Sequence, residues 1–390
     1  MGNYTKQMED AYWGEKYDLH EQVEYEEIIQ FLNSEDFRTY TDGLNYVVGL
    51  KFPNDTLSSL DRVKQCCKEK EIDIKDIASI NTVKSWFNGG ERPKKGDNER
   101  YKMFVLAFAL GLNIEETQYL LTKVYLDRAF NFRNYKELIF YYSLGKNYSY
   151  QQALSLIGEV SFQNISVDKT IHTATLLDKV EGINEDDELI AYINSHSHNF
   201  NISNVTAKTT LEELISISKT VAREEMTLPE YIDDIDNERN IDNISINQLY
   251  EFITAQEMNK DFGTSSIFKN AELPKEIKIN FPEAATFSKK EPSSDELRKM
   301  IIMLFSYEYW CKTQYPHLFN LSLDSKPDYD DYVTQLDVLL TTCGFSQLYA
   351  GNPHDWLYCY CATSSNPLDA FRQILCDALW YENIENTDQD

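Results

Sequence analysis

The sequence predicts an all-α fold, and three observations lead to this prediction. Apolar residues recur at helical spacing through most of the chain. Several of the expected helices begin with a Ser or Asn that can cap the free backbone amides of the first turn. The chain also lacks a strand-rich region, a Gly-rich phosphate loop and a low-complexity tract.

The chain is long enough for two or three domains. It has 390 residues, of which 42% are hydrophobic and 13% aromatic, so it can bury a substantial core. Disordered acidic proteins lack aromatic residues, and we therefore expect folded domains. We divide the chain into an acidic N-terminal segment with helices (1–55), a small domain (56–130), an acidic helical middle region (131–272), a linker (273–292) and a C-terminal helical domain (293–390).

The helices expected in the first half follow one another closely. Apolar periodicity predicts helices over 57–70, 98–110 and 115–130, then a pair over 134–144 and 150–157. Gly111 is expected to end the second of these helices. The pair resembles a single tetratricopeptide unit, but no second copy follows at a 34-residue period. A generic antiparallel helix pair is the favoured interpretation.

In the second half, capping signals mark where helices begin. Helices are expected over 212–219 and 247–257, followed by a proline-containing linker. Ser293, with Glu296 three residues later, forms a capping box before an apolar run. Asn352-Pro353 and Asn366-Pro367 predict two further helix starts, because Asn caps the amides and Pro pre-sets the first helical φ. The first of these two helices is expected to expose Asp355 and to bury Trp356.

Targeting signals are missing from the sequence. No run of 18 apolar residues occurs, so we expect no membrane span. The first 27 residues contain eight acids and two lysines, whereas a signal peptide needs a basic start and an apolar stretch. Seven cysteines, an odd number spread over the chain, fit a reducing compartment. These features predict a cytoplasmic protein without a membrane partner.

Charge is distributed unevenly along the chain. The formal net charge is −27, but residues 51–130 contain 14 Lys or Arg against 12 Asp or Glu. This segment therefore carries +2, and the remaining residues carry −29. A locally basic segment in a strongly acidic chain predicts contact with a polyanion, above all nucleic acid.

A motif lies inside this segment. Thr82-Val83-Lys84-Ser85-Trp86 is followed by Gly89, by Arg92-Pro93, and by an amphipathic helix that ends at Gly111-Leu112. In this order and spacing, residues 57–121 resemble the lambda-repressor-like (XRE-type) helix-turn-helix family. The resemblance implies a small helix-turn-helix-like domain, followed here by a larger helical array. It also implies DNA binding, although some members of such a fold use it for partner contacts instead.

The motif separates a buried face from a polar one. Val83, Trp86 and Phe87 are expected to face the core, which leaves short polar side chains on the opposite face, where they suit base edges in the major groove. Basic residues that follow are expected to contact phosphates. The predicted DNA-binding residues are Asn81, Lys84, Ser85, Asn88, Arg92, Lys94, Lys95, Arg100 and Lys102.

The chain departs from the family pattern just before this helix. The family has Gly and a hydrophobic residue in the turn, and a small residue four positions before that Gly. This chain has Ile77-Ala78 and Asp73 at these places. Asp73 suits the packed face of a second helix poorly, so we expect that helix to be shifted or shortened.

Catalytic and metal-binding constellations are weaker than the motif. Six histidines lie outside any recognisable nucleophile elbow, and we expect no enzyme activity, no cofactor and no metal site. Five residues within a span of 34 lack the usual zinc spacing and are interpreted as packing residues. They are Cys343, His354, Cys359, Cys361 and Cys376.

Two functional hypotheses remain open. The first is a non-enzymatic, sequence-specific DNA-binding regulator, for example of a mobile element, with a helical sensing or assembly region and a homodimeric state. The second is an acidic protein that binds and inhibits a nucleic-acid-binding partner, as phage anti-defence proteins and DNA mimics do. The second rests on eight acids within 224–243 and on the acidic N-terminus. They are Glu224, Glu225, Glu230, Asp233, Asp234, Asp236, Glu238 and Asp242.

Overall fold

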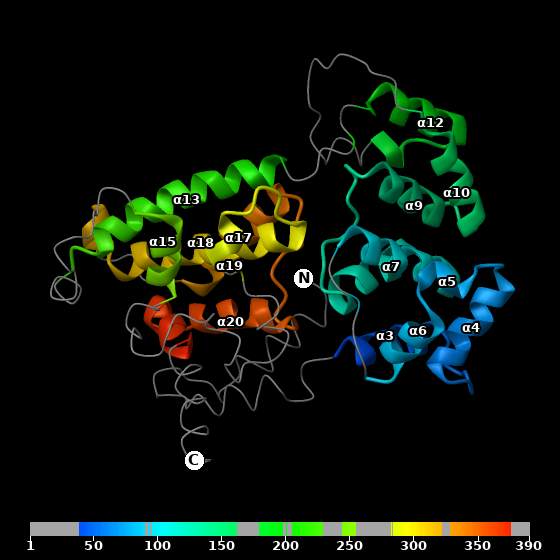
Figure 1. Cartoon of the computed structure of the whole chain (residues 1–390), viewed down its shortest axis with the longest axis horizontal. Helices are drawn as coiled ribbons and strands as arrows, with labels where there is room; N and C mark the ends of the chain where they lie inside the picture. Colours follow the sequence, from blue (N-terminus) through cyan, green and yellow to red (C-terminus); the bar gives the residue numbers. More distant parts are fainter. Residues whose placement is uncertain are drawn as a thin grey trace. The chain divides into compact units, whose positions relative to one another are not determined.

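The computed structural model describes residues 39–89, 96–161, 179–197, 205–228, 244–254, 284–321 and 328–375, together with Pro93, Phe200 and Pro282. The secondary structure of this part of the chain is helical, with no strand, which confirms the predicted all-α class (Figure 1). None of its helices is long and apolar enough to cross a membrane.

The described residues form two compact units. One contains residues 39–205 and Gly344–Ser346; the other contains residues 206–343 and 347–375. The boundaries predicted at 55/56 and 130/131 therefore do not separate units. Leu44, Val47 and Val48 belong to the same core as Trp86 and Phe140. A shared core joins segments that differ in charge, and charge was the basis of the predicted boundaries.

The first unit consists of short helical elements. Side-chain caps fix several of their starts: Ser58, Asn113 and Ser149 each accept a hydrogen bond from the backbone amide three residues later. The elements are α3 (Tyr40–Lys51), α4 (Ser59–Glu69), α5 (Ile74–Ile77), α6 (Ile80–Phe87), α7 (Asp97–Leu110), α8 (Ile114–Tyr119), the π-helical turn η1 (Leu120–Val124), α9 (Tyr135–Gly145), α10 (Tyr150–Glu159) and α12 (Asp186–Ser195).

Most of the predicted helices in this unit are confirmed. Gly111 ends α7 in the left-handed conformation, with φ of 69°, and α9 and α10 form the predicted pair. The helix expected over 115–130 is shorter, because the helical backbone ends after Val124 and Leu126 has a φ of 55°. The apolar pattern of the sequence continues past the end of the helix, and the predicted helix was therefore too long.

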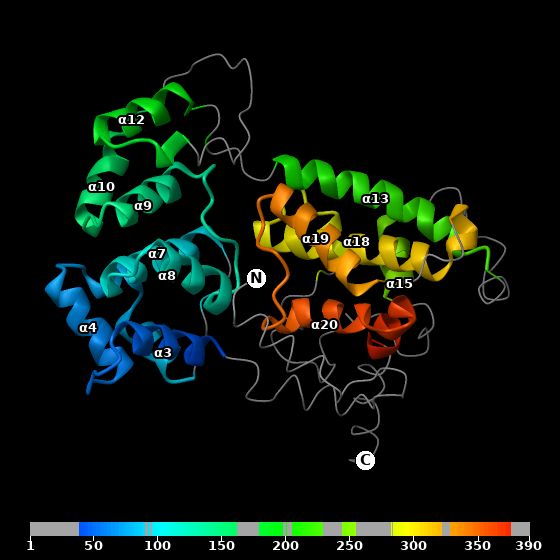
Figure 2. The same cartoon turned by 180° about the vertical axis from the view of Figure 1, so that it is seen from behind.

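Helix α7 is the centre of the first unit. Every residue from Met103 to Leu110 is at most 4% exposed, because α4 and α5 pack on this helix as α9 and α10 do (Figures 1 and 2). A second cluster joins α9 and α10 to α12 and includes Leu138, Leu156 and Leu189. Buried apolar side chains therefore link the segment that carries the motif to the helices that follow it.

The second unit is built around a long buried helix, α18. In both views α18 and α19 lie between α13 and α20 (Figures 1 and 2). The capping box predicted at Ser293 and the Asn cap predicted at Asn352 are both confirmed. The helices are α13 (Val205–Glu225), α15 (Ile246–Ile253), α17 (Ala284–Phe287), α18 (Ser294–Gln314), the 3-10 helix η5 (Pro316–Phe319), α19 (Tyr329–Thr342) and α20 (Pro353–Ala362).

One expectation in this unit is wrong. Asp355, which we expected to be exposed, is 1% exposed. Its carboxylate accepts hydrogen bonds from both terminal nitrogens of Arg298, at 2.8 and 2.7 Å, and from the backbone amide of Tyr349 at 3.1 Å. The partner lies 57 residues away in the sequence, and helical periodicity carries no information about such a partner.

Candidate nucleic-acid interface

Local hydrogen bonds define the turn between α5 and α6. Asp73 is exposed and caps α5, because its side chain accepts a hydrogen bond of 2.9 Å from the amide of Lys75. Ser79 caps α6 in the same way through the amide of Thr82, at 3.2 Å. Helix α5 is therefore short, with four residues. This confirms the shortened second helix that Asp73 predicts.

The buried face of α6 matches the sequence prediction. Val83, Trp86 and Phe87 are 0%, 1% and 6% exposed. The indole of Trp86 meets the ring of Tyr40 edge-on, with centroids 6.0 Å apart. Tyr40 begins α3, which precedes residues 57–121 in the sequence. A helix from outside the segment with the motif therefore holds α6 in place.

The end of α6 is fixed by a hydroxyl from α3. The Oγ1 of Thr41 donates a hydrogen bond of 2.8 Å to the carbonyl of Trp86 and accepts one of 3.1 Å from the amide of Gly89. Gly89 has a φ of 77°, a conformation that favours glycine. The α3 helix thereby sets where α6 stops.

Replacing Thr41 tests this support. Thr41→Val removes both hydrogen bonds and should lower the free energy of unfolding of the first unit by about 1 kcal/mol. Urea denaturation followed by tryptophan fluorescence measures the change, and Thr41→Ser, which keeps the hydroxyl, serves as the control. Equal stabilities for the Val and Ser variants would contradict the proposed role.

The opposite face of α6 is solvent-exposed and largely polar. Asn81, Lys84 and Asn88 are exposed, and Ser85 is half-buried. Within the described part of the chain, Lys84 has no carboxylate partner. Four of the predicted residues therefore lie together along one face of α6, with the side chain of Ser85 less accessible than the others.

Sequence reasoning missed Ile80 at this surface. Its side chain is 45% exposed, an unusual position for an isoleucine at the start of a helix. Ile80, Lys84 and Asn88 follow at intervals of four residues and so form one stripe. The capping signal of Ser79 could have revealed this, because it fixes the first residue of α6.

Arg100 was wrongly predicted to contact phosphate. It is 2% exposed, and its guanidinium forms two hydrogen bonds of 2.9 Å with the carboxylate of Glu137. It also contacts the Asp127 carboxylate at 3.1 Å and the Arg128 carbonyl at 2.8 Å. Burial alone lowers the pKa of Arg100, but Glu137 and Asp127 outweigh it and hold the pKa above its usual value.

The other basic residues have different outcomes. Lys102 is half-buried and paired with Glu99 on the same helix, so its charge is already neutralised. Arg92, Lys94 and Lys95 lie outside the described residues. Beside α6, the short helix α5 adds the exposed Lys75 and Asp76. The described surface around α5 and α6 therefore carries two positive charges, on Lys75 and Lys84, and two negative charges, on Asp73 and Asp76.

The zinc candidates in the second unit are packing residues where they are described. Cys343, Cys359 and Cys361 are buried among apolar side chains, and burial raises the pKa of the Cys343 thiol. Burial lowers the pKa of His354, because it disfavours the charged imidazolium. No group of three His, Cys, Asp or Glu side chains in the described residues could hold a metal ion, while Cys376 lies outside them.

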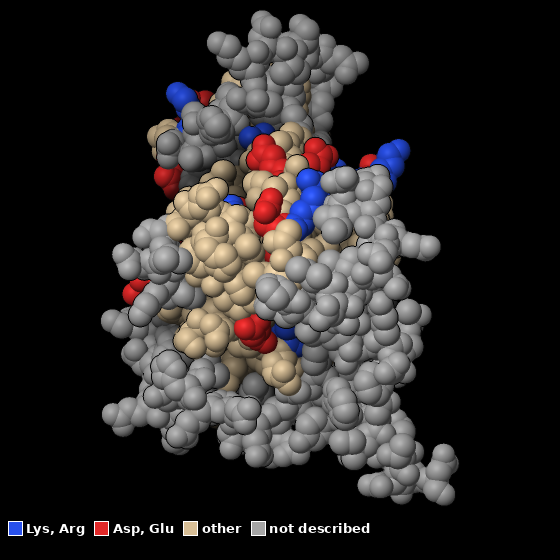
Figure 3. Space-filling view, turned by 90° about the vertical axis from the view of Figure 1, so that its left-hand side faces the viewer, with Lys and Arg blue, Asp and Glu red and all other residues tan. Residues whose placement is uncertain are grey.

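The acidic stretch is only partly described. Glu224 is exposed, but Glu225 is completely buried and paired with Arg372 at 2.6 Å. Glu225 therefore does not belong to an acidic surface, and the six acids from Glu230 to Asp242 lie outside the described residues. On the face shown in Figure 3, described acidic side chains lie in small groups beside basic ones. Neutral surface separates these groups from one another.

Comparison with protein-family models, with curated proteins and with solved structures gives no significant match.

Proposed function

We propose that this protein is a non-enzymatic, sequence-specific DNA-binding regulator, and that α6 is its recognition helix. The main support is the exposed polar face of α6, which lies opposite a fully buried apolar face. A helix anchored in this way can enter the major groove without losing its own packing.

The side chains of α6 offer complementary contacts to bases. The amides of Asn81 and Asn88 can form paired hydrogen bonds with adenine, and the ammonium of Lys84 can bind the acceptors of guanine. The exposed methyl groups of Ile80 can contact the methyl group of thymine. This combination favours sequence reading over purely electrostatic binding.

Charge limits the affinity of a single copy. The described surface around α6 is close to neutral, and the whole chain carries −27, so long-range attraction to phosphates is weak. We therefore propose a homodimer that binds two half-sites one helical turn apart. Light scattering of the protein with and without a selected DNA measures the number of copies.

Binding to a pool of double-stranded DNA fragments tests the function. We expect selection to yield a preferred sequence, and Lys84→Ala should weaken its binding about tenfold. Asn81→Ala should lower the preference for that sequence over a scrambled one. Lys290→Ala, which removes an exposed charge in the other unit, is the matched control and should leave both values unchanged.

Failure of the wild type to bind any fragment at 50 mM salt would reject the regulator. That result would favour the alternative function, which is inhibition of a nucleic-acid-binding partner by the acidic region. It predicts a complex with a basic protein that duplex DNA displaces.

A further inference from the structure

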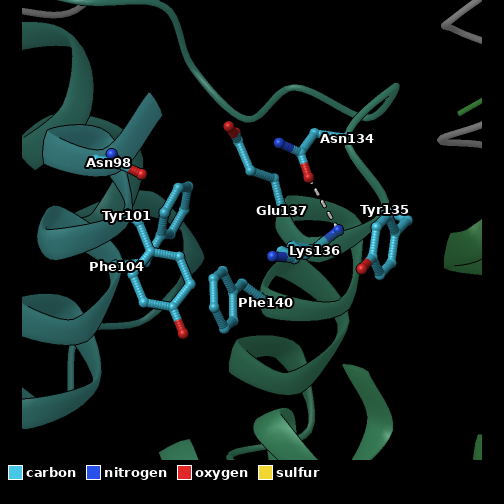
Figure 4. A pocket seen from close by; sticks show the side chains of 8 residues that line it. All are labelled: Asn98, Tyr101, Phe104, Asn134, Tyr135, Lys136, Glu137 and Phe140. Atoms are coloured by element: carbon cyan, nitrogen blue, oxygen red, sulfur yellow. Dashed lines mark hydrogen bonds between the residues drawn. The ribbon is translucent and has the colours of Figure 1, made fainter. Parts of the chain in front are cut away.

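A hollow of about 610 Å³ lies between α7 and α9 in the first unit (Figure 4). This volume falls within the range of small-molecule sites, which is about 300–1,000 Å³. The α6 surface and the proposed DNA contact do not use it. One wall is formed by α7, which lies within residues 57–121. The other wall is formed by α9, the first helix of the α9–α10 pair.

Aromatic rings form the inner part of the hollow. Phe104 and Phe140 stack with centroids 5.2 Å apart, and Tyr101 meets Phe140 at 5.5 Å. The hydroxyl of Tyr101 forms a hydrogen bond of 2.9 Å with the hydroxyl of Tyr150. Phe104 and Phe140 are 1% and 0% exposed, so they support the hollow from beneath. The half-buried ring of Tyr101 is held in place above them and offers its accessible surface to a flat apolar group.

Polar side chains surround the opening. Asn98 from α7 and Lys136 from α9 are exposed at the hollow, and Asn134 caps α9 beside them. Figure 4 shows that these groups come from both sides of the same space.

Among the described residues that line the hollow, the charge without an opposite partner is positive. The carboxylate of Glu137 also lines it, but this carboxylate accepts hydrogen bonds from Arg100 and, at 2.7 Å, from the amide of Asn131. The ammonium of Lys136 has no ion-pair partner within the described residues. The lining therefore matches a molecule with an aromatic body and an anionic group.

We propose that this hollow binds a small aromatic carboxylate. The aromatic body packs against the half-buried ring of Tyr101. The carboxylate accepts hydrogen bonds from the ammonium of Lys136 and from the amide of Asn98. A ligand in this position contacts α7 and α9 at once, but its binding does not depend on the proposed DNA contact.

Calorimetric titration of the full chain with 1-naphthylacetate tests the proposal. We expect saturable binding, and weaker binding of the neutral 1-naphthylacetamide. Lys136→Met should lower the affinity for the acetate about tenfold, which corresponds to about 1.4 kcal/mol, and should leave the affinity for the amide unchanged. Lys68→Met removes another exposed lysine of the same unit, one with no ion-pair partner among the described residues, and is the matched control.

A second variant locates the aromatic part of the site. Tyr101→Leu should weaken binding of both compounds, while near-ultraviolet circular dichroism checks that the fold is retained. The proposal is overturned if neither compound binds saturably at millimolar concentration. It is equally overturned if Lys136→Met and Lys68→Met have the same effect, or if Tyr101→Leu leaves both affinities unchanged. DNA binding plays no part in these readouts.

Discussion

Replacement of Glu137 by Gln should destabilise the first unit by about 3–5 kcal/mol, the usual cost when one partner of a buried ion pair is removed. Glu137 is 5% exposed and Arg100 is 2% exposed, so the guanidinium would keep only the more accessible Asp127 as a charged partner. Part of the cost is the buried positive charge, which Asp127 alone then compensates incompletely.

The effect should be concentrated where α7 meets α9. Hydrogen exchange followed by mass spectrometry can report amide protection separately for these helices and for the second unit. We expect protection to fall in α7 and α9 and to remain unchanged in α18. A single melting temperature would not assign the change to one of the two units.

Glu99→Gln is the matched control for this experiment. It makes the same chemical change on α7, but the Glu99–Lys102 pair is more than a quarter exposed on both sides. Exposed pairs contribute at most about 1 kcal/mol. If Glu137→Gln costs no more than Glu99→Gln, the Arg100 cluster does not hold these helices together.

Arg298→Met should have a comparable effect on the second unit, with a characteristic pH dependence. In the wild type, burial raises the pKa of Asp355, but Arg298 outweighs burial and holds it below its usual value. The resulting stabilisation is fully present above about pH 3.8, the usual pKa, and is lost as the pH falls through the lower folded-state value.

Removal of Arg298 reverses this dependence. Burial then dominates, the pKa of Asp355 rises above its usual value, and the folded variant takes up a proton as the pH falls. The variant should be less stable than the wild type by about 3–5 kcal/mol at pH 7, and the difference should shrink towards pH 4.

Urea denaturation of both proteins between pH 4 and 8 measures this difference. His354 lies beside Asp355, and burial lowers the pKa of its imidazole, so both proteins should lose stability below about pH 6.5. The comparison between variant and wild type largely removes this shared contribution. A difference that stays constant with pH would show that Arg298 does not control the ionisation of Asp355.

Local sequence signals predicted the candidate interface better than long-range ones. The apolar spacing of Val83, Trp86 and Phe87 and the glycine at position 89 act over a few residues, so the buried face and the end of α6 follow from the sequence. The contribution of α3 could not be predicted, because Thr41 and Gly89 are 48 residues apart. Nothing in the local pattern around Thr41 identifies its partner.

The sequence by itself determined the helical class, most helix starts and the buried face of α6, since periodicity and caps depend on neighbouring residues. Only the tertiary structure decided which charged residues are surface groups. Arg100, Asp355 and Glu225 look like solvent-exposed charges in the sequence, yet each meets an opposite charge from a distant segment. The low polarity of the interior makes such pairing necessary for a buried charge, and folding alone brings these partners together.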